Sequence, residues 1–337
     1  MEISLSEAKD FIINYTTKLG FDEKDSQFIA QNLIEAEISG KKSHGLVSLL
    51  NLKNEVEKGG INTASSLFKY TYITKNILLV NGEGKTGYAV IPQTLDISLK
   101  RCKLEKVFCV GIENFGYSSG YIGQYARISA ENDLIFIAFN KSPGGLVPYG
   151  AKKSLWGTNP LTIGIPYKNT PIILDMASSL ISWGEVFLSL ILGKKIPLGK
   201  AVNSRGRPTD NPSLAVEGGV LPLAEYKGSG LAFIMEILAY TLITSKENYC
   251  KQRKWGCFYI LIDPGVFLPK IVFQKRIKES IKRLKELPRV KKGSNIFFPG
   301  ERASFNRFVC LNKGRFRISK RLWQCLNFSL KNFKNPF

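Results

Sequence analysis

The stretch "LLVNGEGKTGYAV", residues 78–90, decides between two fold classes. It places Gly82, Gly84 and Gly87 in a GxGxxG pattern between an apolar run and a helical one, as in a Rossmann turn. A Rossmann unit also needs an acidic residue about 20 residues further on, to bind the ribose. That distance falls near Val107, and the next acid, Glu113, is several residues late. The stretch therefore predicts a glycine-rich turn at the start of a helix, in a non-Rossmann fold.

Helical and strand patterns occur in blocks around this turn. Helical periodicity predicts helices over 4–20, 22–40 and 46–60, and Glu7 follows Ser4 by three residues as in a capping box. A helical pattern returns over 229–243. Runs of β-branched and aromatic residues predict a hairpin over 70–84 and strands over 107–114, 134–142, 161–166 and 172–177. Helices at both ends of a strand-rich middle indicate an α+β fold.

The chain is long enough for two domains. Its 337 residues exceed the length at which one core usually stops growing, and 44% of them are hydrophobic. The pattern changes suggest a discontinuous helical domain, 1–70 plus about 240–337, and a sheet-rich domain over 71–239. No run reaches the roughly 18 apolar residues of a membrane span. The N-terminus is acidic and amphipathic, unlike a signal peptide. We therefore expect a cytoplasmic protein without membrane contact.

Cysteine and histidine usage argues against a metal site. The six cysteines are widely spread without a CxxC pair, and the chain has one histidine. A Cys/His zinc site needs more ligands than this pattern offers. In a chain of this size, reduced thiols are the better interpretation. We expect no metal.

The net charge of +21 is concentrated near the C-terminus, where residues 246–337 hold 23 Lys and Arg against five Asp and Glu. Such asymmetry can mark an arm that binds nucleic acid or an anionic membrane. In "FQKRIKESIKRLKELP" (273–288), however, Phe273, Ile277, Ile281 and Leu284 share one helical face and the cations lie opposite. That pattern packs one face and exposes the other, so we favour a solvated helix over a nucleic-acid site.

The only histidine, His44, lies in "SGKKSHGLVSL" (39–49), just past the end of a predicted helix. Imidazole transfers protons readily because its ordinary pKa lies near neutral pH. A lone histidine at this place can equally be a packed core residue or a surface residue. The residues alone leave these three interpretations open.

Six separated stretches together resemble the malate/L-lactate/L-sulfolactate dehydrogenase family, which also includes ureidoglycolate dehydrogenase and diketogulonate reductase. They are "KKSHGLVSLL" (41–50), "VGIENFGYSSGYIGQYA" (110–126), "VPYGAKKSLWGTNPLTIGIP" (147–166), "IILDMASSLISWGE" (172–185), "IPLGKAVNSRGRPTDNPSLAVEGGVLPLAEYKGSGLAFIMEIL" (196–238) and "FFPGERA" (297–303). The resemblance covers essentially the whole chain. It implies a mainly antiparallel, non-Rossmann sheet domain that binds NAD or NADP, inserted between helical segments, usually in a homodimer.

The resemblance also implies the residues of the site. A hydride would pass between the cofactor and a small 2-hydroxy or 2-oxo acid, with His44 as the proton donor or acceptor and Ser43 orienting its ring. The cofactor-binding positions it implies are Asp175, Met176, Ala177 and Ser178, then Tyr226 and Lys227, then Gly300 and Glu301. The positions implied to face the substrate are Ser48, Asn114 and Asn159.

Several positions depart from the family pattern. Ser48 stands where the family's SHGxxR arginine holds the substrate carboxylate, and Asn114 stands where its NHFG motif has histidine. Ala224 and Glu225 replace a glycine-rich approach to the KG motif. Serine carries no charge and asparagine transfers no proton. Two hypotheses stay open: an active dehydrogenase that uses His44 alone, or a degenerate member that keeps the fold and binds cofactor or an anionic partner without turnover.

Overall fold

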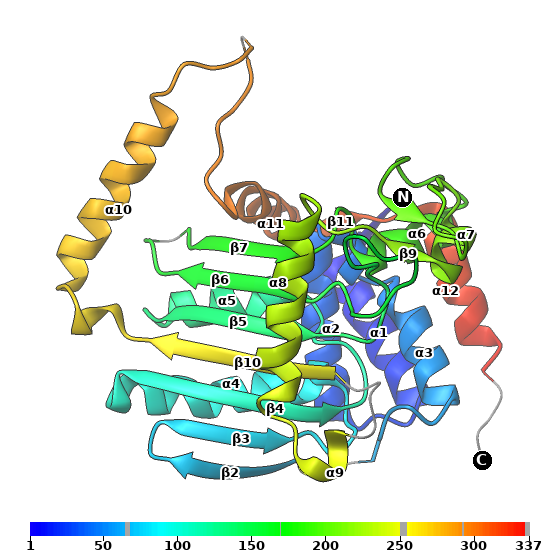
Figure 1. Ribbon diagram of the computed structural model, residues 1–337, viewed down its shortest axis with the longest axis horizontal. Coiled ribbons are helices and arrows are strands. Elements are labelled where there is room, and N and C mark those ends of the chain that lie inside the picture. Colours follow the sequence, from blue (N-terminus) through cyan, green and yellow to red (C-terminus); the bar gives the residue numbers. More distant parts are fainter. Residues whose placement is uncertain (65–67, 169, 250–254, 292, 334–337) are drawn as a thin grey trace.

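A seven-stranded sheet with the order β2-β3-β4-β10-β5-β6-β7 forms the centre of the molecule (Figure 1). The computed structural model describes residues 1–64, 68–168, 170–249, 255–291 and 293–333. The strands are β2 (Lys69–Thr74), β3 (Ile77–Asn81), β4 (Val107–Phe115), β5 (Ile135–Lys141), β6 (Pro160–Ile165), β7 (Ile172–Ala177) and β10 (Trp255–Ile262). Two small antiparallel pairs lie outside this sheet: β1 (Glu2–Ser4) with β11 (Arg315–Arg317), and β8 (Ala201–Val202) with β9 (Gly219–Val220).

The sheet is mainly antiparallel. The β3–β4 pair is parallel, and the other neighbouring pairs run antiparallel. The predicted α+β class is therefore confirmed, and the predicted hairpin and strands are present as β2 to β7. One strand departs from the predicted domain division. β10 falls within the C-terminal range assigned to the helical domain, yet it pairs with β4 and β5 in the middle of the sheet.

Helices cover both faces of the sheet and form a separate layer beside it (Figure 1). α4 and α5 pack on one face, and α8 crosses the other. Ser4 Oγ accepts the Glu7 N–H at 3.0 Å, as the capping box predicts. None of the described helices is long and apolar enough to cross a bilayer. The helices are α1 (Leu5–Lys18), α2 (Glu23–Ile38), α3 (Ser48–Glu57), α4 (Gly87–Glu105), α5 (Ile122–Glu131), α6 (Trp183–Leu192), α7 (Pro212–Glu217), α8 (Tyr226–Glu236), α9 (Lys246–Tyr249), α10 (Lys270–Lys285), α11 (Glu301–Lys313) and α12 (Lys320–Lys331).

In the glycine-rich turn between β3 and α4, backbone N–H groups are hydrogen-bonded to carbonyls of the same chain. The Gly84 N–H donates to the Asn114 carbonyl and the Gly87 N–H donates to the Tyr117 carbonyl, both at 2.8 Å. In a Rossmann turn such N–H groups would face a pyrophosphate instead. The prediction of a structural turn, not a cofactor loop, is confirmed.

Two apolar cores correspond to the sheet and to the helical layer. The sheet core lies between the strands and the helices α4 and α5; its large side chains include Phe108, Phe115, Tyr125, Phe136 and Tyr259. The helical core joins α1, α2, α3 and α12; its side chains include Ile12, Tyr15, Ile29, Leu33 and Leu326. A buried ion pair links the two layers, since Lys85 Nζ of the glycine-rich turn lies 2.8 Å from Asp25 Oδ2 of α2.

Helix α10 stands apart from the rest of the chain (Figure 1). The predicted helix is present, but none of its residues is buried. Its apolar stripe lines an open groove with Ile172 of β7 and Leu268, and Gln274 hydrogen-bonds the Pro166 carbonyl at 2.9 Å. The predicted solvated face is present, and the apolar face is half-buried in the groove without joining a buried core of the described residues. Helical periodicity shows that a face is apolar but not what covers it.

Glu35 of α2 holds three helices together through two arginines. Its carboxylate accepts from Arg307 Nε of α11 at 2.8 and 3.0 Å, and it lies 3.3 Å from Arg127 Nε of α5. Arg127 and Glu35 are both buried. A buried charge of this kind is stable only while its partners remain in place.

Replacing Glu35 tests this arrangement. Glu35→Gln should lower the free energy of unfolding by about 3 kcal/mol, because it leaves a buried arginine without its counter-ion. Urea denaturation monitored by circular dichroism measures the change. Glu131→Gln, at an exposed position of α5, makes the same chemical change and should shift stability by less than about 0.5 kcal/mol. Equal effects of the two variants would contradict a stabilising role for the Glu35 cluster.

Candidate active site

The segment that carries the lone histidine is a short 3₁₀ turn, Lys42–His44, directly after α2. Ser43 Oγ lies 3.1 Å from His44 Nδ1, so the two predicted catalytic residues are in hydrogen-bond contact. The turn is pressed against α6, because a Cβ at Gly184 would come within 2.4 Å of the Ser43 carbonyl oxygen. The turn that carries the histidine is thus packed against both α2 and α6.

The surroundings of His44 favour its neutral form. Burial lowers the pKa of His44 below its ordinary value of 6.5. The carboxylates of Asp175 and Glu185 oppose this shift, and the Lys41 ammonium adds to it. A neutral imidazole at pH 7 can accept a proton from a hydroxyl group, and its protonated form can return one. The position suits proton transfer.

A buried acid of α2, Glu37, contacts the residues that directly follow the histidine. Its Oε1 accepts the Leu46 N–H at 3.0 Å, and a Cβ at Gly45 would collide with its carboxylate. Burial raises the pKa of Glu37 to about 7. The sequence interpretation did not single out Glu37, because nothing in the helical pattern of α2 distinguishes a buried acid from an exposed one.

Asp175 lies on β7, the edge strand of the sheet, and reaches the start of α5. Its Oδ1 accepts the Thr162 hydroxyl at 2.8 Å, and its Oδ2 accepts the Gly123 N–H at 3.0 Å. A carboxylate is stabilised at a helix N-terminus by the free N–H groups there. The predicted residues Met176 and Ala177 continue the strand and are half-buried.

Ser178 brings the end of β7 against the start of α8. Its hydroxyl donates to the Thr158 carbonyl at 2.9 Å, and its own carbonyl accepts the Leu223 N–H at 2.8 Å. A Cβ at Gly228 would lie 2.5 Å from that carbonyl, so only glycine permits this approach. The predicted residues Tyr226 and Lys227 precede Gly228 and are exposed.

The approach to α8 is strained. Ala224 and Glu225 have φ values of 47° and 57°, in the left-handed region that glycine occupies most easily. These are the two positions where the sequence lacks the expected glycines. Ala224 and Glu225 thus adopt the left-handed backbone conformation that glycine would be expected to take there.

The third segment predicted to bind the cofactor, around Gly300 and Glu301, contacts β7 near the start of the strand. The Ile173 N–H donates to the Pro299 carbonyl at 3.0 Å, and Gly300 has a φ of 85° as it leads into α11. Glu301 is engaged within the chain: its carboxylate accepts the Phe298 N–H at 3.1 Å and pairs with Lys285. Glu301 therefore stabilises the turn, while Gly300 lines a pocket.

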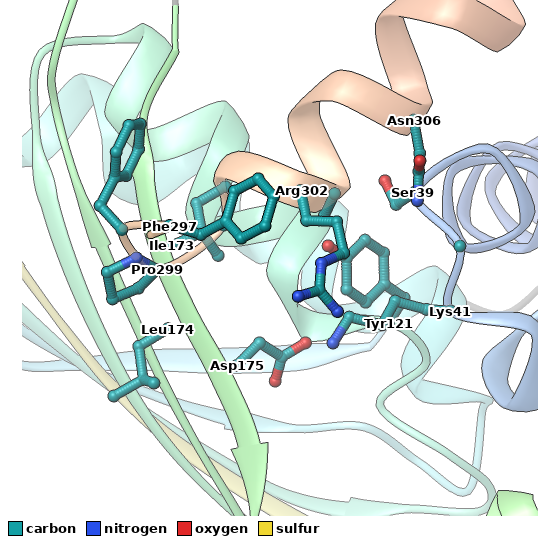
Figure 2. Close-up of a pocket in the computed structure, with 14 residues that line it drawn as sticks. Ser39, Lys41, Tyr121, Ile173, Leu174, Asp175, Phe297, Pro299, Arg302 and Asn306 are labelled. Carbon is teal, nitrogen blue, oxygen red and sulfur yellow. The ribbon is translucent and has the colours of Figure 1, made fainter. Parts of the chain in front are cut away.

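This pocket, of about 410 Å³, lies between the end of α2, β7 and the start of α11 (Figure 2). Figure 2 shows the side chains of Lys41, from the segment after α2, and Arg302, from α11, both directed toward the Asp175 carboxylate. Tyr121 also lines the pocket, and burial raises its pKa. The sequence interpretation assigned no role to Lys41, Tyr121 or Arg302, although each lies within or beside a quoted stretch.

The three residues predicted to face the substrate do not line this pocket as the described residues form it. Ser48 is buried at the start of α3, where it hydrogen-bonds Tyr88. Asn114 Nδ2 donates to Asn81 Oδ1 at 2.7 Å, next to the glycine-rich turn. Asn159 Oδ1 accepts the Ser142 N–H at 3.0 Å, and its Nδ2 donates to Glu236 Oε2 at 3.0 Å. These side chains hold parts of the fold together. No group of three or more metal-ligating side chains occurs among the described residues.

Comparison with known proteins gives the same family from sequence and from structure. The profile of the malate/L-lactate dehydrogenase family matches residues 3–327. The malate/(S)-sulfolactate dehydrogenase of Methanothermus fervidus is 28% identical over 317 residues, 91% of each chain. The (2R)-3-sulfolactate dehydrogenase (NADP(+)) of Chromohalobacter salexigens is 28% identical over 73% of this chain and 74% of its own. The solved sulfolactate dehydrogenase of Methanocaldococcus jannaschii has a TM-score of 0.81 at 27% identity, covering 98% of this chain and 97% of its own.

The raised pKa of Glu37 makes stability depend on pH. Between its ordinary pKa of 4.5 and about 7, the folded chain holds a proton that the unfolded chain has lost. Stability from this group therefore falls as pH rises through that window, by about 3 kcal/mol in total. Glu37→Gln removes this dependence while it can still accept the Leu46 N–H.

Urea denaturation at pH 5 and pH 8 measures the effect as a difference between variants. Glu37→Gln should gain stability relative to wild type on going from pH 5 to pH 8. Glu217→Gln, at an exposed position at the end of α7, should track wild type at both values. A constant offset between Glu37→Gln and wild type would show that Glu37 is ionised throughout this range.

Proposed function

This chain belongs to the malate/L-lactate dehydrogenase family, and we propose that it interconverts a small 2-hydroxy acid and its 2-oxo acid with His44 as the proton-transfer group. The family and the relatives support a 2-hydroxy acid dehydrogenase. The observation that carries the proposal is the setting of His44: it is half-buried, held by Ser43, and within electrostatic reach of Asp175.

Oxidation of a 2-hydroxy acid removes a proton from the hydroxyl and a hydride from the carbon. Under this proposal, His44 accepts the hydroxyl proton. Ser43 Oγ engages Nδ1 of His44, which leaves Nε2 for the substrate hydroxyl. In the reverse direction the same nitrogen returns the proton to the new alkoxide. The lowered pKa of His44 keeps the ring neutral at pH 7, which is the form that can accept the hydroxyl proton.

The residues along β7 fit a nicotinamide dinucleotide. When bound, this cofactor supplies the uptake or release of hydride. Gly228 and Gly300 let α8 and α11 approach β7 where a side chain would collide with backbone. Lys227 is exposed and directly precedes Gly228, which approaches Ser178; its ammonium can pair with a phosphate. We propose that Asp175 to Ser178, Tyr226, Lys227 and Gly300 hold NAD or NADP, and that Glu301 supports the turn.

The pH dependence of turnover tests the role of His44. For oxidation, kcat/KM should rise with pH as the ring loses its proton and level off, with a midpoint below 6.5. For reduction it should fall over the same range, because the protonated ring is the donor. His44→Ala should lower kcat/KM by about 10²-fold to 10⁴-fold and remove the pH dependence.

Cofactor binding separates the two hypotheses about activity. Titration of wild type and His44→Ala with NADH and NADPH, followed by fluorescence, should give similar affinities. Binding without turnover on a panel of 2-oxo acids would identify a degenerate member. A His44→Ala variant that keeps full activity would refute the role given to the histidine.

We also propose a homodimer in which the apolar stripe of α10 is covered by a second copy. The stripe residues Phe273, Ile277, Ile281 and Leu284 are only half-buried, and they line a groove open to solvent. The exposed cations Lys275 and Lys282 lie on the opposite side of the helix. Stripe-to-stripe contact would bury apolar surface and leave these charges in water.

Substitution of the stripe tests this arrangement. The double variant Ile277→Lys with Ile281→Lys should halve the mass measured by light scattering, because each buried ammonium lacks a partner. The double variant Lys275→Ala with Lys282→Ala, on the exposed face, should keep the wild-type mass. If the stripe variant keeps the dimer mass, the interface lies elsewhere.

A further inference from the structure

The pocket beside Asp175 contains two cations, Lys41 and Arg302 (Figure 2). Lys41 follows α2, and Arg302 lies in the first turn of α11. The two elements meet closely here, since a Cβ at Gly40 would lie 2.8 Å from Asn306 Nδ2. The packing of the end of α2 against α11 thus brings both cations to the same pocket.

Both cations are available to a ligand. Their side chains are exposed, and Glu301, the acid next to Arg302 in the described sequence, pairs with Lys285 instead. The Arg302 guanidinium packs over the Phe297 ring, with its central carbon 4.9 Å from the ring centroid. Such stacking orients the guanidinium and leaves its N–H donors free to bind an anion. Lys41 adds a second positive group to the same pocket.

Asp175, the one acid among the described residues that line the pocket, does not balance these charges. Each of its oxygens already accepts a hydrogen bond within the chain, from the Thr162 hydroxyl and from the Gly123 N–H. In Rossmann folds, a carboxylate that binds the ribose 2′-hydroxyl favours NAD, whereas an arginine accommodates the 2′-phosphate of NADP. Two cations beside one engaged carboxylate match the second arrangement.

The pocket lies apart from the places that the proposed function gives to other parts of the cofactor. Its lining residues on β7, Ile173 to Asp175, precede Ser178 by three to five residues, which is about 10 to 17 Å of extended chain. Lys227, proposed to pair with a phosphate, directly precedes Gly228, which approaches Ser178. His44 does not line the pocket as the described residues form it. The pocket therefore suits the adenosine end of the dinucleotide.

The charge of the two cations fits a phosphomonoester. The 2′-phosphate, which distinguishes NADP from NAD, is such a group, and at pH 7 it carries a charge of about −1.5 to −2. Each phosphate of the pyrophosphate bridge carries a single charge. A guanidinium can donate two parallel N–H bonds to phosphate oxygens, and an ammonium adds a point charge. Two cations directed to one place thus match the monoester better than the bridge.

We propose that Lys41 and Arg302 bind the 2′-phosphate of NADP and so make this chain bind NADP more tightly than NAD. This inference rests on the proposed function, because it takes the dinucleotide to lie along β7. The two residues determine specificity for the cofactor and take no part in the transfer of the proton or the hydride.

Isothermal titration calorimetry with NADP⁺ and NAD⁺ tests the assignment without turnover. Wild type should bind NADP⁺ on the order of 100-fold more tightly than NAD⁺, since two charged contacts are gained. Lys41→Met and Arg302→Met should each weaken NADP⁺ binding by about tenfold or more and change NAD⁺ binding by less than about threefold. Arg302→Lys keeps the charge without the planar fork and should fall between wild type and Arg302→Met. Lys18→Met and Arg315→Met remove one exposed cation each outside the pocket and serve as matched controls.

The pH dependence of binding identifies the phosphomonoester. From pH 5 to pH 7.5, the affinity of wild type for NADP⁺ should rise relative to that for NAD⁺, because the 2′-phosphate loses its second proton near a pKa of about 6. Protein groups such as His44 and Asp175 act on both cofactors, so NAD⁺ is the internal reference. The double variant Lys41→Met with Arg302→Met should lose this relative rise.

The outcomes separate this inference from the proposed function. If wild type binds NADP⁺ with the expected preference but reduces no 2-oxo acid, the cofactor assignment stands and the proposed function fails. If wild type turns over an acid but the pocket variants weaken both cofactors equally, or behave like their controls, the assignment to the 2′-phosphate is wrong while the function stands. Wild type that binds neither cofactor overturns both. Thermal unfolding of each variant shows whether a loss of affinity reflects a loss of fold.

Discussion

The buried carboxylate of Glu35 joins three helices that end or begin beside the pocket. α2 ends at the segment that carries Lys41 and His44, α5 begins where Asp175 accepts the Gly123 N–H, and α11 begins at Gly300 and Arg302. Arg127 and Arg307 tie α5 and α11 to Glu35 on α2. Ion pairs in a low-dielectric interior resist small displacements strongly. The spacing of the pocket walls thus depends on one acid that does not itself line the pocket.

Under the proposed function, the edge strand β7 binds the cofactor in place of the glycine-rich turn of a Rossmann fold. In this chain the N–H groups of the glycine-rich turn are directed into carbonyls of its own chain. Along β7, by contrast, Pro299 and Gly300 cover the start of the strand and Gly228 contacts its end at Ser178. At all of these positions glycine lets one backbone approach another closely. What separates the two places under the proposed function is β7 itself, whose residues Asp175 to Ala177 are only half-buried and so are partly accessible to a cofactor.

Local pattern predicted the elements well and their long-range partners poorly. The helix cap at Ser4, the hairpin before the glycine-rich turn and the strands β4 to β7 follow from periodicity and turn residues, which act over a few neighbours. The position of β10 does not, because its partners β4 and β5 lie more than a hundred residues away in sequence. The apolar face of α10 was visible in the sequence, but its exposure depends on what lies opposite.

For the candidate active site, too, the sequence predicted local segments better than the contacts that their side chains make. The motif resemblance named Asp175 to Ser178 together with Tyr226 and Lys227, and the fold brings these segments together at Gly228. It also named Ser48 and Asn159, whose side chains are engaged in internal hydrogen bonds. Glu37 was not found because its raised pKa follows from burial, which no residue within α2 reveals. Burial is a property of the whole packed chain, so such groups emerge only once the layers are assembled.

The electrostatics around His44 set the form of the ring in the free protein. Burial lowers the pKa of the imidazole, the Asp175 and Glu185 carboxylates oppose this shift, and the Lys41 ammonium adds to it. The ring is therefore neutral at pH 7, the form that can accept the hydroxyl proton under the proposed function. Once the ring is protonated, the same two carboxylates favour its charge, so these surroundings also suit the return of the proton in the reverse direction.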